Sequence, residues 1–166
     1  YNLPYHVFSL DDTDALVNAL KHVAVVIHAA GPFHYTAKQM VEACIAAGTH
    51  YIDINGDISV FEFIKRYDAK AKAANVMLLP GSGFDEVPTD CLAYSLKEQM
   101  PDATHIEIAF LPRGGGGVSH GTATTMASKA GEGGCVRENG SIKRTPLGHK
   151  GKWININGKK IFAMSI

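Results

Sequence analysis

The chain of 166 residues is poor in the features that mark several large classes of protein. It has three cysteines, Cys44, Cys91 and Cys135, and this odd, widely spaced set indicates reduced thiols in a cytoplasmic protein rather than a disulfide framework or a zinc site. No apolar run approaches the roughly 18 residues of a membrane span, and no signal peptide is visible. Its 16 basic and 16 acidic residues cancel, so no charge excess points to nucleic acid or to an anionic membrane.

What remains is the composition of an ordinary globular domain, or of one domain with a second piece attached. Hydrophobic residues make up 46% of the chain and charged residues 19%, enough for a buried core and too few charges for a disordered tail. Of the eight histidines, His22, His28 and His34 are six apart, a spacing that fits neither a helix face nor a strand face, so no metal site is expected. The sequence opens on "YNLPYHVFSLDD" without a methionine, so a piece of a longer protein is expected.

Strand and helix patterns alternate four times over the first 100 residues. Strands are predicted at 6–10, 23–30, 50–54 and 76–80, and helices at 14–22, 36–48, from Ser59 to about Ala74, and at 88–100. Short loops between them are typical of a doubly wound α/β sheet with parallel strands. Residues 23–30 are apolar on both faces, which predicts helices on both sides of that sheet.

Several residues are suited to begin or end these helices. Asp12 or Thr13 can cap the first one, and Gly48 suits the end of the second. Ser59-x-x-Glu62 predicts a capping box for the third, and Pro88 fits the first position of the fourth.

The pattern changes after residue 100. Residues 104–111 alternate like a half-exposed strand, 113–122 form a glycine-rich link, and 122–131 carry a weak helix pattern. Asn157-Gly158 between two apolar runs predicts a type I′ hairpin over 152–164. We therefore expect two domains, 1–100 and 101–166, the second an α+β domain with antiparallel strands.

Three of the strands end in loops rich in small residues, namely "AAGPF" after residue 28, "NGD" after residue 54 and "PGSGFDEVP" after residue 79. Each can be a simple turn, but the carboxyl ends of parallel strands are also where such sheets bind ligands. Asp53 can be a turn former or a cleft carboxylate, and Asp85 a helix cap or a catalytic group. The residues themselves leave these alternatives open.

The amino-acid sequences of these loops resemble those of one family. "VVIHAAGPFHYTAKQMVEACIAAGTHYIDINGD", "LLPGSGFDEVPTDCLA" and "GGGGVSHGTATTM" are similar, in order, to motifs of the saccharopine dehydrogenase-like oxidoreductases, which include a trans-acting enoyl reductase-like branch. The resemblance implies part of a Rossmann domain that binds NADP or NAD, followed by part of a domain for a small-molecule substrate and for formation of a homodimer. It names no catalytic residue.

Site residues follow from the same resemblance. Ala29, Ala30, Gly31, Pro32 and Phe33 would line the cofactor, Asp11 or Asp12 would lie near its adenine, and Gly83, Phe84 and Asp85 would face the cleft near the nicotinamide. The glycine-rich G-x-G-x-x-G fingerprint of such domains is absent from residues 1–30. This departure leaves a non-catalytic, Rossmann-derived scaffold that has lost cofactor binding as the alternative to an oxidoreductase.

Overall fold

The computed structural model describes residues 3–111, 117 and 119–165. The chain divides into two compact units, Tyr1–Ile106 and Glu107–Ile166, and each is described here by itself. Among the described residues, no helix is both long enough and apolar enough to cross a membrane.

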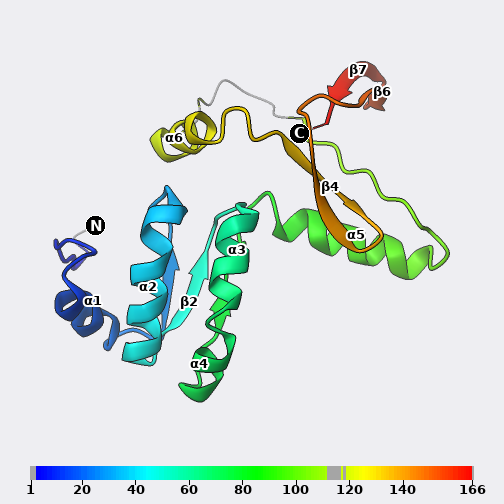
Figure 1. Cartoon of the computed structure of the whole chain (residues 1–166). Coiled ribbons are helices and arrows are strands. Elements are labelled where there is room, and N and C mark those ends of the chain that lie inside the picture. The colour runs from blue at the N-terminus through cyan, green and yellow to red at the C-terminus, as the bar shows by residue number, and fades with distance from the viewer. Residues whose placement is uncertain (1–2, 112–116, 118, 166) are drawn as a thin grey trace. The chain divides into compact units, whose positions relative to one another are not determined.

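The first unit is an α/β fold around three parallel strands, as predicted (Figure 1). Its elements are α1 (Thr13–Leu20), β1 (Val25–His28), α2 (Phe33–Ala47), β2 (His50–Asp53), α3 (Ile58–Lys65), α4 (Asp68–Ala73), β3 (Leu78–Leu79) and α5 (Val87–Gln99). The strands lie in the order β1-β2-β3, with His28 beside Asp53 and Ile52 beside Leu79. Parallel strands need crossover connections, and α2 and the α3–α4 pair supply them.

The hydrophobic core lies between the sheet and α1, α2 and α3. The alternation of β2 turns Tyr51 and Asp53 to this face, where both are fully buried. The helices contribute apolar residues at three- and four-residue spacing: Leu16, Leu20, Ala37, Met40, Val41, Cys44, Val60 and Ile64. Burial of this set stabilises the arrangement that brings the three strand ends together.

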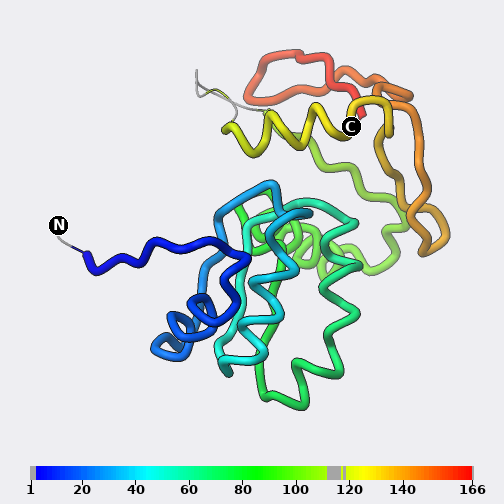
Figure 2. Tube along the Cα trace, turned by 60° about the vertical axis from the view of Figure 1, so that its left-hand side comes forward, coloured from blue at the N-terminus to red at the C-terminus, as the bar shows by residue number. Residues whose placement is uncertain are grey.

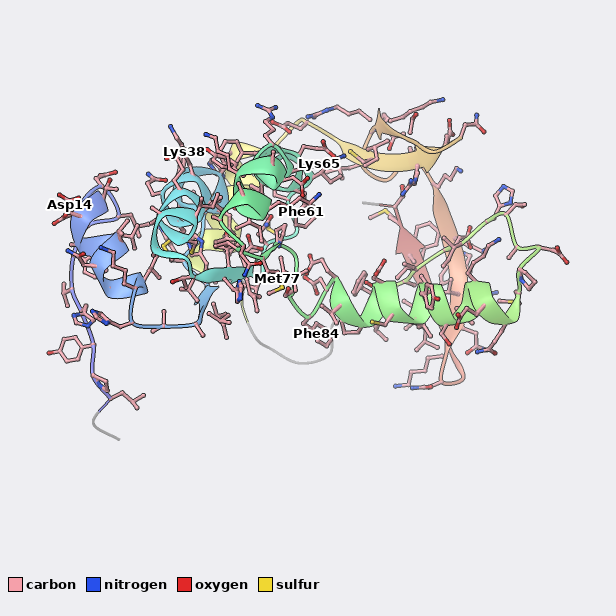
Figure 3. The ribbon with its side chains drawn as sticks, turned by 90° about the horizontal axis from the view of Figure 1, so that it is seen from below. Asp14, Lys38, Phe61, Lys65, Met77 and Phe84 are labelled. Atoms are coloured by element: carbon pink, nitrogen blue, oxygen red, sulfur yellow. The ribbon has the colours of Figure 1, made fainter. Side chains whose placement is uncertain are left out.

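The other face of the sheet departs from the sequence prediction. Val25 is 42% exposed, Ile27 69% and Met77 43%, so the expectation of helices on both faces is wrong for the described residues. Figure 3 shows α1, α2 and α3 on one side of the strands, away from Met77. α5 buries none of its side chains, so it supplies no cover for that second face.

The helix ends follow the sequence signals in part. Asp12 caps α1 by accepting the Ala15 N–H at 3.0 Å, and Gly48, at φ +75°, ends α2. α2 begins at Phe33 rather than at 36, and Pro88 is the second residue of α5. The capping box at Ser59 is wrong, because the Asp57 carboxylate already accepts the Ser59 N–H at 2.9 Å. The helix predicted from Ser59 to Ala74 is divided into α3 and α4.

Residues 6–10 do not form the predicted strand. A strand needs a neighbouring backbone edge, and the three strands of the sheet pair with one another while none of the described residues pairs with this segment. Figure 2 shows the chain before α1 running away from the sheet. Leu3, Tyr5 and Val7 are consequently exposed.

The second unit consists of α6 (His120–Ser128) and two antiparallel pairs, β4 (Gly134–Glu138) with β5 (Ser141–Thr145), and β6 (Gly151–Ile156) with β7 (Lys159–Met164). Asn157 and Gly158 both have positive φ, which confirms the hairpin predicted there. The same dipeptide, Asn139-Gly140, turns the first hairpin, which the sequence analysis missed. Residues 104–111 form no strand, because none of the described strands pairs with them. Part of the glycine-rich link lies outside the described residues.

Candidate functional site

The three loops that end β1, β2 and β3 meet at one edge of the sheet, because the strands are parallel. A hydrogen-bonded group of buried polar side chains joins them. Its members are His28, 3% exposed, Asn55, 2%, and Tyr51 and Asp53, both 0%. Buried polar groups persist only where they are hydrogen-bonded, so the contacts of this group determine how the edge is built.

Asp53, the last residue of β2, is the junction of the group. Its Oδ1 accepts the N–H of Gly81 at 2.8 Å, and the backbone N–H and side-chain amide of Asn55 at 3.1 and 3.0 Å. Its Oδ2 accepts the Tyr51 hydroxyl at 2.7 Å. Its backbone carbonyl accepts the Ser82 N–H at 2.7 Å. Asp53 therefore holds the loop after β3 against the loop after β2. Of the two roles that the sequence left open, turn former or cleft carboxylate, the structure shows a buried carboxylate that joins two loops.

Asn55 extends the junction toward α3. Its side-chain oxygen accepts the Asp57 N–H at 2.7 Å, while Asp57 caps α3. Hydrogen bonds to the side chains of Asp53 and Asn55 thus hold the two ends of the "NGD" loop.

His28 connects the junction to the loop after β1. Its Nδ1 lies 3.1 Å from the Tyr51 hydroxyl, and its Nε2 lies 3.2 Å from the Ala30 carbonyl oxygen. Burial lowers the pKa of His28, while the Ala30 carbonyl and the charge of Asp53 oppose that shift. Burial also raises the pKa of Tyr51, and the bond to Asp53 adds to the shift, so Tyr51 is a neutral hydroxyl.

The "AAGPF" loop presents small groups to the outside. Ala29, Ala30 and Gly31 are exposed, and Pro32 and Phe33 are half-buried. The Phe33 ring lies edge-on to His28, with ring centroids 5.2 Å apart. No side chain caps the start of α2, and its first turn holds no acidic residue. The positive end of the helix dipole therefore has no acidic side chain in its own first turn to oppose it.

The residues predicted near the nicotinamide lie in the loop between β3 and α5. Gly83 is buried, and a Cβ there would lie 3.1 Å from the Ile54 carbonyl oxygen. Phe84 is 82% exposed at the approach to α5 (Figure 3). Asp85 is exposed, and its backbone carbonyl accepts the Thr89 hydroxyl at 2.6 Å. Gly83 thus belongs to the packed edge, whereas Phe84 and Asp85 project from it.

Asp11 and Asp12 serve a local structural role. Asp12 caps α1, and the Asp11 N–H and carboxylate bond to Ser9. Among the described residues, neither aspartate forms a hydrogen bond with the three loops.

Glu86 is a residue of this edge that the sequence analysis missed. Its carboxylate occupies the space that side chains at Gly56 and Gly83 would fill, with oxygens 2.5 and 2.8 Å from the positions of their missing Cβ atoms. Burial raises the pKa of Glu86, and the charges of Asp85 and Asp53 add to the shift. Glu86 also lines an open depression together with Phe61, Leu79, Pro80, Gly81, Ser82, Val87, Asp90 and Cys91. Gly56 and Gly83, which both precede it in the sequence, were the available signal.

Groups of three or more His, Cys, Asp or Glu side chains suited to a metal ion do not occur among the residues that the structure describes. The exposed thiols of Cys91 and Cys135 and the buried thiol of Cys44 are all free.

Comparison with known proteins finds a family that the first part of the chain resembles. Residues 2–79 match the model of the saccharopine dehydrogenase NADP binding domain. This segment is similar to that family, in agreement with the resemblance found in the sequence, and the match supports the predicted class of cofactor, a nicotinamide nucleotide. The matched range contains the "AAGPF" loop, Tyr51, Asp53 and Asn55.

Curated relatives agree with this resemblance. A saccharopine dehydrogenase-like oxidoreductase of Bos taurus is 35% identical over 71 residues, 42% of this chain and 17% of the relative. A Mycobacterium tuberculosis protein, named as a candidate trans-acting enoyl reductase, is 30% identical over 111 residues, 61% of this chain and 26% of the relative. A Caenorhabditis elegans lipid droplet localized protein is 29% identical over 98 residues, 58% of this chain and 23% of the relative. The chain thus spans about a quarter or less of the length of these relatives, and no solved structure matches it.

Proposed function

We propose that this chain is part of an NAD(P)-dependent oxidoreductase and supplies one wall of its cofactor site. The observation that carries the proposal is the exposed "AAGPF" loop at the carboxyl edge of a parallel sheet, within a segment similar to the NADP-binding family. Ligands of such sheets bind outside the carboxyl ends of the strands.

The residues present fit a nicotinamide nucleotide on this side. Ala29, Ala30 and Gly31 leave room for a flat ligand against the backbone, Phe33 adds a half-buried ring, and the uncapped start of α2 suits a phosphate. Gly83, Phe84 and Asp85 would bound the nicotinamide side. Asp11 or Asp12 would lie near the adenine, in addition to the local roles of Asp12 as the cap of α1 and of Asp11 as a partner of Ser9. Bound NADP or NAD would supply hydride transfer, so the role of this chain is to bind and orient.

The proposal extends to the substrate and the assembly. We infer a small-molecule substrate of an unidentified class, a first domain of residues 1–100, and a second domain of residues 101–166 for substrate contact and homodimer formation. A cytoplasmic location is our expectation from the cysteine pattern, and cell fractionation against lipid droplets tests it, given the name of the C. elegans relative.

Titration with NADPH, followed by nicotinamide fluorescence, tests the cofactor proposal. We expect binding that is lost in Ala29→Glu, because the added carboxylate would repel the nucleotide at the exposed end of β1. Ala46→Glu is the matched control, since it places the same charge on an exposed position of α2. Equal affinity of the two variants, or no binding by the unmodified chain and by the longer gene product, contradicts the proposal.

A scaffold that has lost cofactor binding is the second candidate, and the absence of G-x-G-x-x-G from residues 1–30 favours it. It predicts a dimer whose formation is unaffected by Ala29→Glu, together with no NADPH binding at any concentration tested.

A further inference from the structure

The buried group at the sheet edge has a feature that the proposed function does not use. Three of its side chains form a continuous path from the loop after β3, through Asp53, Tyr51 and His28, to the backbone at Ala30. Apolar residues of the same size would fill these core positions at a lower free-energy cost of burial. The path ends on one peptide group of the "AAGPF" loop, so the orientation of that peptide is what the path determines.

The protonation of the His28 ring follows from its partner at Nε2. The Ala30 carbonyl oxygen can only accept a hydrogen bond, so an attractive contact at 3.2 Å requires the hydrogen on Nε2. Nδ1 then carries no hydrogen, so it accepts from the Tyr51 hydroxyl at 3.1 Å only when the single hydroxyl hydrogen is not donated to Asp53 at 2.7 Å. The Tyr51 hydroxyl thus lies between two acceptors, His28 and Asp53, and contacts both.

The Ala30 carbonyl has a second donor from α2. The Thr36 hydroxyl donates to it at 2.8 Å. Two donors, one from β1 and one from α2, therefore hold this carbonyl oxygen.

Fixing the carbonyl also fixes the next N–H. In a trans peptide, C=O and N–H point in opposite directions, and the Ala30–Gly31 bond is not among the cis bonds of the described chain. With the Ala30 oxygen turned toward His28 and Thr36, the Gly31 N–H points away from them. Gly31 is exposed, and its N–H has no hydrogen-bond partner among the described residues.

We propose that the path Asp53–Tyr51–His28 positions the Ala30–Gly31 peptide so that the Gly31 N–H is presented as a hydrogen-bond donor to an acceptor atom of the nicotinamide nucleotide. His28 and Tyr51 are then positioning residues, and Gly31 makes the contact through its backbone. The proposal rests on the proposed function, because it assigns a role within that same cofactor wall.

Two substitutions of His28 separate positioning from packing. The side-chain amide nitrogen of His28→Gln can take the place of Nε2 and donate to Ala30, whereas His28→Leu fills the buried space without a donor. Packing alone predicts that Leu is the better substitute, because it buries no polar atom. If His28 positions the peptide, His28→Gln should bind the cofactor more tightly than His28→Leu. His28→Leu should then be the more stable variant, and His28→Gln the one with the higher affinity.

NADPH titration of the full chain provides the main readout. We expect His28→Leu to lower the affinity about five- to tenfold, the value of one neutral hydrogen bond, and His28→Gln to stay within about twofold of the unmodified chain. Tyr51→Phe removes the hydroxyl that orients the ring, and should weaken binding by about threefold. Tyr67→Phe is its matched control, because Tyr67 also donates to a carboxylate, Glu42, at 2.7 Å.

The Gly31 amide signal in a ¹⁵N–¹H spectrum provides a readout that a purely structural role would not move. It should shift when NADPH is added to the unmodified chain and to His28→Gln, and should stay in place in His28→Leu. If neither the unmodified chain nor the longer gene product binds NADPH, the proposed function fails, and this inference with it. If it binds, while His28→Leu binds equally well and the Gly31 signal never moves, the positioning role alone is wrong.

Discussion

The two units of the chain achieve their structure in different ways. In Tyr1–Ile106, residues from α1, α2, α3 and β2 that are far apart in sequence meet in one core. In Glu107–Ile166, none of the described residues is buried, and each hairpin is joined by a local Asn-Gly turn. The first unit depends on long-range packing, whereas the second depends on turn geometry and pairing between neighbouring strands.

Thiol labelling should show the largest difference between the units. Cys44 is fully buried and burial raises its pKa to about 12, whereas Cys135 is exposed. Because the thiolate is the reactive form, we expect a disulfide reagent at neutral pH to label Cys44 at least about a thousandfold more slowly than Cys135. Mass spectrometry of timed samples measures this, and comparable rates would show that the core is not formed.

Leu16→Ala should destabilise the first unit by about 2–5 kcal/mol, because it removes a buried side chain between α1 and α2. The single tryptophan, Trp153, lies in β6, so its fluorescence reports on the second unit while far-UV circular dichroism reports mainly on the helices. We expect the dichroism transition in urea to move and the fluorescence transition to stay. A parallel shift of both would mean that the units unfold together.

Gly158→Ala should destabilise the second unit and leave the first unchanged, the opposite of Leu16→Ala. Gly158 has φ +78°, a conformation that costs a residue with a Cβ about 1 kcal/mol. The fluorescence midpoint should fall while the dichroism midpoint stays. Gly117→Ala is a control without a neighbour within 4 Å and without a positive φ, and it should leave both midpoints unchanged.

Glu86 and Glu138 should show the smallest effects, with opposite signs. Burial raises the pKa of Glu86 in the folded state, so its contribution is most favourable below its ordinary value of 4.5 and is lost as pH rises through the raised pKa. Glu86→Gln should remove that loss and raise stability at neutral pH.

The Lys143 partner lowers the pKa of Glu138, so its contribution is present above 4.5 and is lost as pH falls through the lowered pKa. Carboxyl ¹³C titrations by NMR measure both directions. Identical titration curves for the two residues would contradict this assignment.

The sequence supplied the order of strands and helices, the ends at Asp12 and Gly48, and the Asn157-Gly158 turn, because these depend on neighbouring residues. It also indicated that the "AAGPF" loop is a candidate binding loop, because the loop resembles a motif of the family. It misplaced the start of α3, because Asp57 and Ser59 are both good caps and only the backbone geometry chooses between them. It predicted strands at 6–10 and 104–111 from apolar patterns, although a strand also requires a partner that a pattern cannot reveal.

By itself, the sequence determined the local conformations, since propensity, capping and turn chemistry act within a few residues. Only the tertiary structure decided that His28, Tyr51 and Asp53 form one path, because parallel register places His28 beside Asp53. It also decided which way the Ala30–Gly31 peptide faces, because donors from β1 and α2 converge on a single carbonyl. Hydrogen bonds of that kind depend on distances across the sheet edge, which no spacing along the chain encodes.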